Sequence, residues 1–213
     1  MSYLFEILPS LLSGASMTLQ VFVLVLIFSI PLGVLIAFAL QVHWKPLHHL
    51  INIYIWIMRG TPLLLQLIFI YYVLPSIGIR LDRLPAAIIA FVLNYAAYFA
   101  EIFRGGIDTI PKGQYEAAKV LKFSPFATVR YIILPQVTKI VLPSVFNEVM
   151  SLVKDTSLVY ALGISDLILA SRTAANRDAS LVPMFLAGAI YLILIGIVTI
   201  ISKKVEKKYS YYR

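Results

Sequence analysis

The sequence contains no cysteine and few charged residues. Only 13% of its 213 residues are Asp, Glu, Lys or Arg, whereas about 25% is usual for a soluble domain. Without cysteine the chain has no disulfide, iron–sulfur cluster or thiolate metal site. It also lacks the G-x-x-x-x-G-K-[ST] phosphate-binding loop, so it cannot supply a nucleotide-hydrolysing site of that kind. His43, His48 and His49 have no acidic neighbour, and we expect an interfacial loop there and no metal site. The sequence shows no arrangement of a nucleophile and a base that would indicate an enzyme.

Apolar residues are abundant instead, at 61% of the chain. Soluble domains have about 45–50%, and one helical crossing of a bilayer takes roughly 20 residues. The apolar runs therefore predict an all-α membrane protein with five transmembrane helices in a single domain, residues 1–213. We expect Pro9 and Gly14 to break the first apolar run, and we place the spans near residues 15–41, 50–75, 85–103, 136–162 and 183–202.

The net charge of +8 is distributed unevenly between the expected loops. Lys and Arg accumulate in cytoplasmic loops of membrane proteins. With the N-terminus outside and the C-terminus cytoplasmic, most basic residues lie in the inner loops and tail, and only four lie in the outer loops: Arg80, Arg83, Arg172 and Arg177. We expect the basic tail, residues 203–208, to contact anionic membrane lipid, and we expect no nucleic-acid partner.

A short helix is predicted in the inner loop before the fourth span, near residues 113–122. One interpretation is an amphipathic helix that rests on the membrane surface. Ala117 and Ala118 favour a second interpretation, because small side chains allow the surface of another protein to approach closely. The sequence alone leaves both open.

Four motifs in this chain occur in the order of a known family. Glu116-Ala117-Ala118 is followed by Ile132-Ile133-Leu134-Pro135, and the spacing resembles the EAA loop of ABC-importer permeases. Lys122 stands where that family usually has Gly. The segments at residues 59–63, 100–107 and 154–158 resemble those of the histidine/glutamine-type branch, which carries polar amino acids.

The resemblance implies a type I ABC importer permease in the plasma membrane of a prokaryote. It implies as partners cytoplasmic ATP-binding subunits, a second permease subunit that is identical or different, and an extracellular solute-binding protein docking near residues 166–178. The chain itself would carry no cofactor, because ATP and Mg belong to the ATPase. The loop helix would be the coupling helix, with these ATPase-facing residues: Tyr115, Glu116, Ala117, Ala118 and Lys119.

Two ionisable residues lie near the inner ends of neighbouring spans. Arg59 and Glu101 are at compatible depth, and a charge within a membrane needs a partner or a cavity. We interpret them as a structural ion pair, with a direct substrate role as the alternative.

The fourth span carries two carboxylates on one helix face. Glu148 and Asp155 are seven residues apart, which at 100° per residue returns to nearly the same direction, and Ser151 lies on that stripe. Lys154 is offset by about 100° and cannot neutralise both. On the third span, Asn94, Tyr98 and Glu101 form a second polar stripe. The two stripes predict a cavity between the spans, although Glu148 could instead be protonated or bonded to a neighbouring span.

Combined with the resemblance, the acidic stripe predicts a cationic amino acid as substrate: arginine first, then lysine or histidine. A guanidinium presents a planar fork of donors that matches carboxylates. We expect the carboxylate of the substrate to be bound by donors from Asn94, Ser151 or Lys154. The alternatives are a neutral polar substrate such as glutamine, or a self-contained secondary transporter, which the absence of internal repeats disfavours.

Overall fold

The computed structural model describes residues 2–209; Met1 and residues 210–213 of the expected domain, and the side chain of Ser2, lie outside the described part. All regular structure within residues 2–209 is helical, and one helix, α1, is 38 residues long. The elements in chain order are α1 (Ser2–Ala39), α2 (Lys45–Gly60), α3 (Leu63–Ile68), η1 (Phe69–Val73), η2 (Leu74–Ile77), α4 (Arg83–Asp108), α5 (Lys112–Val120), α6 (Pro125–Thr128), η3 (Val129–Ile133), α7 (Leu134–Asp155), η4 (Thr156–Leu162), α8 (Leu167–Asp178) and α9 (Val182–Tyr209).

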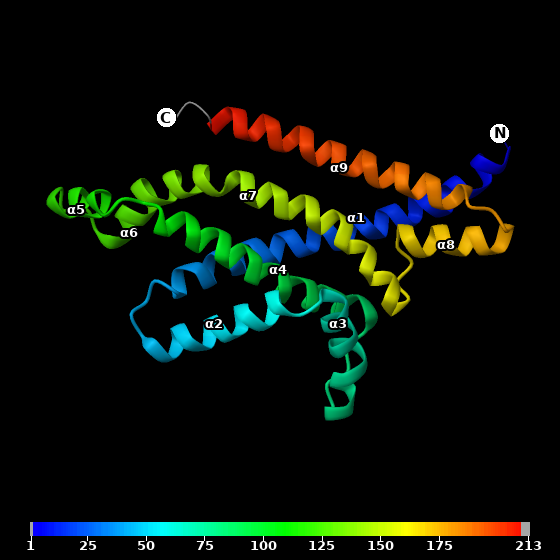
Figure 1. The fold of residues 1–213 in the computed structure, drawn as a ribbon, viewed down its shortest axis with the longest axis horizontal. Coiled ribbons are helices and arrows are strands. Elements are labelled where there is room, and N and C mark those ends of the chain that lie inside the picture. Colours follow the sequence, from blue (N-terminus) through cyan, green and yellow to red (C-terminus); the bar gives the residue numbers. More distant parts are fainter. Residues whose placement is uncertain (1, 210–213) are drawn as a thin grey trace.

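Four helical stretches are long and apolar enough to cross a membrane, and a bent pair can supply a fifth crossing. The four are Tyr3–Ala39, Arg83–Asp108, Pro125–Leu162 and Val182–Tyr209. In Figure 1, α5, α6 and the last turns of α9 lie toward one end of the molecule, and α8 and the first turns of α1 lie at the other. The long helices run between these two ends, as expected of crossings.

The first helix differs from the expected span because it continues through both of its prolines, Pro9 and Pro31. Each proline removes one backbone hydrogen bond, and helices in membranes tolerate this when neighbouring groups satisfy the freed carbonyl. Gly14 does not end the helix either: its missing side chain lets α1 approach α8, since a Cβ there would lie 2.7 Å from the Asp166 carbonyl oxygen. The expectation that Pro9 and Gly14 delimit the span is wrong.

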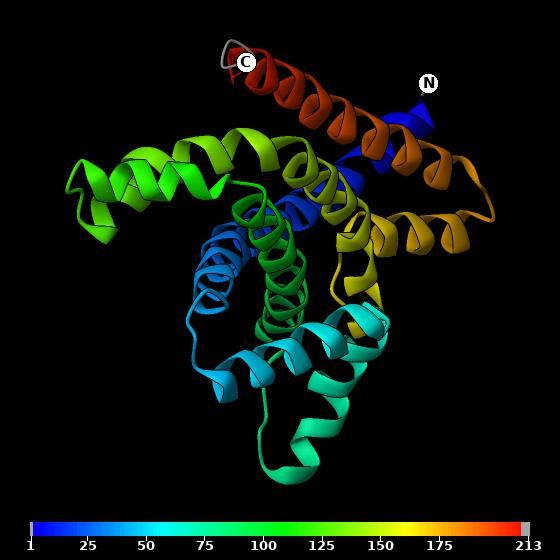
Figure 2. The ribbon, with the colours of Figure 1, turned by 60° about the vertical axis from the view of Figure 1, so that its left-hand side comes forward.

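The second expected span is not one straight helix. Its halves, Lys45–Gly60 and Leu63–Ile77, meet at an angle of 106° at the Thr61-Pro62 break. Figure 2 shows α2 turning sharply into the segment that begins with α3. The residue before a proline is disfavoured in the helical conformation, and Thr61 is extended, with φ −122° and ψ 148°.

The core is built around α4. Its aromatic side chains Phe91, Tyr95 and Phe99 are at most 1% exposed and pack against one another, with ring centroids 6.2–6.3 Å apart. Helices α1, α3 and α7 surround this stack. The close packing of α1 on α4 depends on Gly33, where a Cβ would lie only 2.5 Å from the Cβ of Phe99. Helix α4 is therefore the rigid element on which the polar residues described next are mounted.

Candidate functional site

A cavity of about 510 Å³ lies where α4, α7 and the α2–α3 break meet. All six residues that the sequence analysis assigned to substrate binding line it, from two helices far apart in the chain. The lining residues are Thr61, Pro62, Leu63, Leu64, Asn94, Tyr95, Tyr98, Glu148, Ser151, Lys154, Asp155 and Leu158.

The break between α2 and α3 is held by side chains. Pro62 has no N–H, so the Met58 carbonyl four residues earlier lacks its helical donor. Asn94 Nδ2 and Gln66 Nε2 donate to that carbonyl instead, at 2.8 and 3.0 Å. Gln66 Nε2 also donates to Thr61 Oγ1 at 2.8 Å. The polar groups freed at the bend are thus satisfied within the protein, as membrane burial requires.

Asn94 has a structural role that the sequence analysis did not foresee. The side chain is on a residue only 4% exposed, and its amide donates to both the Met58 carbonyl and Gln66 Oε1, the latter at 3.1 Å. With both N–H bonds directed at protein acceptors, this amide is not available as a donor to a substrate carboxylate. The expected donor role of Asn94 is therefore wrong, although the residue does line the cavity.

The α7 side of the cavity carries the two carboxylates and one ammonium group. Glu148 and Asp155 both line the cavity, in agreement with their seven-residue spacing, and Lys154 lies beside them. Asp155 Oδ2 accepts a hydrogen bond of 2.7 Å from the Tyr95 hydroxyl. Within residues 2–209, the Glu148 carboxylate makes no hydrogen bond or ion pair. Ser151 adds a hydroxyl on the same stripe, so this wall carries two carboxyl groups, one amino group and one hydroxyl.

Two parts of the cavity were missed by sequence reasoning. Tyr95 was not among the candidate residues. A carboxylate at membrane depth needs a hydrogen-bond donor, and this requirement was a usable signal. Residues 61–64 were placed within the second span and given no role in a site. Their Gly60-Thr61-Pro62 interruption was the better pointer, since broken membrane helices commonly line binding sites.

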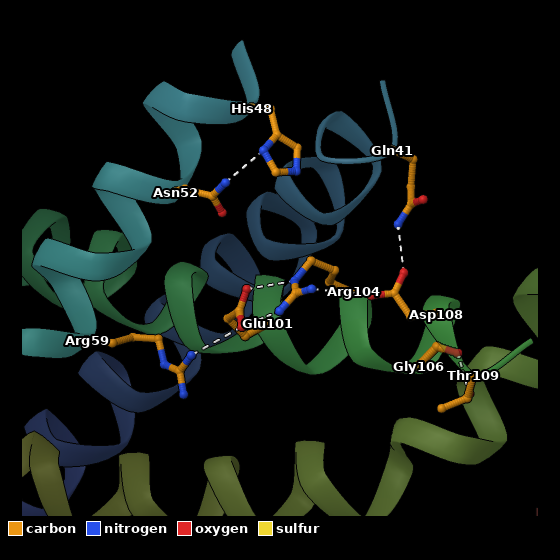
Figure 3. Close-up of polar contacts among 9 residues, drawn as sticks. All are labelled: Gln41, His48, Asn52, Arg59, Glu101, Arg104, Gly106, Asp108 and Thr109. Carbon is orange, nitrogen blue, oxygen red and sulfur yellow. Dashed lines mark hydrogen bonds and ion pairs between the residues drawn. The ribbon is translucent and has the colours of Figure 1, made fainter. Parts of the chain in front are cut away.

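Arg59 and Glu101 form the expected contact, with Arg59 Nη1 3.4 Å from Glu101 Oε2. Figure 3 shows that Glu101 has a second and closer partner, Arg104, whose Nε and Nη2 donate to the two carboxylate oxygens at 2.9 and 2.8 Å. Arg104 also contacts Asp108 Oδ2 at 3.3 Å, and Gln41 donates to Asp108 Oδ1 at 3.4 Å. The ion pair is therefore part of a network that links α1, α2 and α4.

The loop helix α5 ends two residues earlier than expected, at Val120. Lys122 adopts the left-handed conformation with φ 58°. The amides of Lys122 and Phe123 donate to the carbonyls of Lys119 and Ala118, both at 3.0 Å. This is a Schellman C-cap, in which glycine is usual at the Lys122 position. The geometry explains why glycine suits this position.

The exposed face of α5 includes four of the five residues assigned to ATPase coupling: Tyr115, Glu116, Ala117 and Lys119. Ala118 is the exception, because it is only 1% exposed and packs inside the chain. Its assignment to a docking surface is wrong; its small side chain instead lets α5 pack close to the rest of the loop. Partial burial, with the charge of Asp108 as a smaller cause, raises the pKa of Tyr115.

The opposite end of the molecule carries the helix α8. The Asp166 carboxylate accepts N–H bonds from Ile168 and Leu169 at 3.1 and 2.9 Å and so caps the helix. Burial raises the pKa of Asp166 despite these bonds. At the other end of α8, Asp178 accepts from Arg177 and from the Tyr3 hydroxyl, and the Arg177 bond is the main cause of its lowered pKa.

Metal binding finds no support in the part of the chain that the structure describes. No group of three or more His, Asp or Glu side chains is close enough there to hold an ion. His48 Nδ1 instead lies 2.8 Å from Asn52 Nδ2 on the same helix.

Comparisons with known proteins identify the family. Residues 29–211 match the family described as "Binding-protein-dependent transport system inner membrane component". The chain is 37% identical over 211 residues to the "Putative glutamine transport system permease protein GlnP" of Rickettsia felis, covering 97% of each chain. It is 36% identical to the "Arginine transport system permease protein ArtQ" of Bacillus subtilis, covering 94% of this chain and 93% of that one. The "L-cystine transport system permease protein TcyB" of the same organism is 34% identical, with 96% and 88% covered.

Two solved structures have the same fold. The crystal structure of an amino acid ABC transporter with histidines superposes with a TM-score of 0.88, at 30% identity and 97% coverage of both chains. The MetNI methionine ABC transporter in an inward-facing conformation gives a TM-score of 0.76 at 18% identity, with 99% of each chain covered, and supports the fold alone. These matches exclude the alternative of a self-contained secondary transporter. The chain is a subunit of an assembly whose ATPase is a separate chain. The protein belongs to the binding-protein-dependent transport system inner membrane components and is a multi-pass plasma-membrane permease subunit of a polar amino-acid ABC importer.

Proposed function

We propose that this permease carries basic amino acids, with arginine preferred over lysine and histidine. The observation that carries the proposal is the Glu148 carboxylate, which lines the cavity and has no bonded partner among residues 2–209. A cationic side chain supplies the missing charge, and a guanidinium can donate two parallel hydrogen bonds to one carboxylate. Asp155, fixed by the Tyr95 hydroxyl, offers a second acceptor to the same ligand.

The substrate carboxylate needs donors in the same cavity. With the Asn94 amide bonded to protein, Ser151 and Lys154 are the remaining candidates from the sequence analysis. The Lys154 ammonium balances the substrate carboxylate, while Glu148 and Asp155 balance the two positive groups of arginine. A zwitterionic amino acid with a cationic side chain thus leaves the occupied cavity neutral.

Neutral polar amino acids such as glutamine are the second candidate. The observation that favours them is Lys154, which leaves one net negative charge on the cavity wall and not two. The relatives do not select between the candidates, since their descriptions name glutamine, arginine and cystine at 34–37% identity. Substrate choice therefore has to be measured on this chain.

The experiment is ATP-dependent uptake of labelled arginine, lysine, histidine, glutamine and glutamate into liposomes that contain the permease, its ATPase and its binding protein. We expect arginine to give the highest kcat/KM. Glu148→Gln and Asp155→Asn should each raise the KM for arginine by about tenfold or more, since a charge-assisted hydrogen bond contributes about 1.5–3 kcal/mol. Glu6→Gln, which alters an exposed carboxylate of α1, is the matched control and should transport normally. Preferred uptake of glutamate, or normal arginine uptake by both cavity variants, refutes the site.

We propose further that the exposed face of α5 docks on the ATPase subunit. Tyr115, Glu116, Ala117 and Lys119 present polar and small side chains there, beside the largely exposed apolar residues Val120 and Leu121, 80% and 69% exposed. Glu116→Lys reverses a charge on this face without touching the buried Ala118. It should abolish substrate-stimulated ATP hydrolysis while arginine binding persists; full retention of stimulated hydrolysis contradicts the assignment.

The proposed assembly also includes an orientation in the membrane and two further partners. The N-terminus faces outward, a second permease subunit completes the translocation unit, and the solute-binding protein docks around residues 166–178. Protease accessibility of a tag on each terminus in sealed vesicles tests the orientation. An N-terminal tag that is cleaved from the cytoplasmic face would contradict the outward-facing N-terminus.

A further inference from the structure

The inference concerns Arg59, which joins the ion network to the cavity. Arg59 lies in the last turn of α2, directly before the break that borders the cavity. Its Cζ atom is 5.2 Å from the centroid of the Tyr98 ring, and Tyr98 lines the cavity together with Glu148. Its guanidinium therefore contacts a carboxylate outside the cavity, Glu101, and a ring of the cavity wall, Tyr98.

The bond between Arg59 and Glu101 is the weaker of two competing contacts. Glu101 already receives two hydrogen bonds from Arg104, at 2.9 and 2.8 Å, and this bidentate pair balances its charge. Arg59 approaches one oxygen only, at 3.4 Å, and 42% of its side chain is exposed (Figure 3). Loss of this contact would leave Glu101 paired with Arg104.

Glu148 is the alternative partner for the same guanidinium. It makes no hydrogen bond or ion pair within residues 2–209, and it lines the same cavity as Tyr98, on whose ring the Arg59 guanidinium stacks. The Arg59 side chain is long and partly exposed, and it stacks on Tyr98 at the cavity wall.

We propose that Arg59 is a competing cation that expels a basic substrate from the cavity. When its guanidinium pairs with Glu101, Glu148 is free to bind a cationic amino acid; when it turns to Glu148, it occupies the same acceptor and favours release. The proposal rests on the proposed function, because it requires a cationic substrate on Glu148. Arg59 is then a specificity residue whose effect depends on the charge of the ligand.

Two variants that break the same ion pair distinguish this role from a structural one. Arg59→Gln removes the competing cation, so arginine should bind about five- to tenfold more tightly, and its kcat should fall because release slows. Glu101→Gln removes the outer partner of Arg59 and directs it to Glu148, so arginine should bind more weakly. A merely structural pair would shift both variants in the same direction.

The measurements are equilibrium binding of labelled arginine to the purified permease–ATPase complex without nucleotide, and kcat and KM in liposomes. Citrulline, which replaces the guanidinium by a neutral urea group, is the matched ligand. Its affinity should change less than that of arginine in Arg59→Gln, because its N–H donors use the same acceptor without a positive charge. Arg59→Lys keeps the charge and should restore near-normal affinity. Arg130→Gln removes an arginine stacked on Tyr131 at 5.5 Å, away from the cavity, and is the matched control for charge loss.

The outcomes separate the two proposals. If the unaltered protein neither binds nor transports arginine, the proposed function fails. If it does, and the two variants shift arginine affinity in the same direction, or citrulline affinity changes as much as arginine affinity, the role of Arg59 is refuted while the basic substrate stands. Opposite shifts that are larger for arginine than for citrulline support it.

Discussion

Replacing Lys122 by glycine should stabilise the end of the loop helix. Lys122 has a φ of 58°, in the left-handed region, and it directly follows the C-cap residue Leu121, at the position where glycine is usual. A residue with a Cβ costs about 1–2 kcal/mol in this conformation. Glycine avoids that cost but loses about 0.4–1 kcal/mol through the greater freedom of its unfolded chain. The net gain is about 0.5–1 kcal/mol.

Amide hydrogen exchange measures this gain directly. The N–H groups of Lys122 and Phe123 donate to the carbonyls of Lys119 and Ala118, so exchange requires the cap to open. A gain of about 0.5–1 kcal/mol slows exchange at Phe123 about two- to fivefold. Lys119→Gly is the matched control, because the same substitution inside the helix costs about 0.7–1 kcal/mol and should speed exchange. Equal or faster exchange in Lys122→Gly refutes the argument from backbone conformation.

Two further predictions concern packing and capping. Gly33→Ala places a Cβ 2.5 Å from Phe99 Cβ and 3.0 Å from the Ala100 nitrogen, so α1 must move away from α4. Overpacking of this kind costs about 1–3 kcal/mol. Gly196→Ala is the control: nothing lies within 4 Å of the added Cβ, and the substitution should stabilise the helix by up to about 1 kcal/mol. Thermal melts followed by tryptophan fluorescence should rank Gly33→Ala below Gly196→Ala, and the reverse order contradicts the close approach. Burial raises the pKa of Asp166 above 3.8, so the stability linked to its proton is present below pH 3.8 and lost as pH rises through the raised pKa. Asp166→Asn should therefore gain in melting temperature relative to the unaltered protein as pH rises from 3.8, and a gap independent of pH would exclude this linkage.

Charge placement and periodicity were enough to predict much of the cavity. Glu148 and Asp155 line it as their spacing on one helix requires, and the α4 stripe supplies Asn94 and Tyr98. Both predictions depend only on the fixed rotation per residue of an α-helix. The contact between Arg59 and Glu101 was predicted from their similar depth in the membrane.

Features that depend on contacts between distant segments escaped the sequence analysis. The amide of Asn94 was expected to face a ligand, but the carbonyl that it satisfies lies 36 residues away on α2 and is freed only by Pro62. Ala118 was placed on an outer surface because a helical pattern does not say which face of a short helix packs on its own chain. Helix α1 continues past Pro9 because its surroundings tolerate one missing backbone bond.

The bend at residues 61–62 has a mechanical consequence. The two half-helices on either side are joined by extended backbone and by side-chain bonds to the Met58 carbonyl, not by a continuous helical ladder. A change in their 106° angle would break those side-chain bonds and leave every backbone hydrogen bond inside α2 and α3 intact. Moving the segment that borders the cavity therefore costs the side-chain bonds of Thr61, Gln66 and Asn94, together with the packing of Leu67 against the aromatic stack of α4.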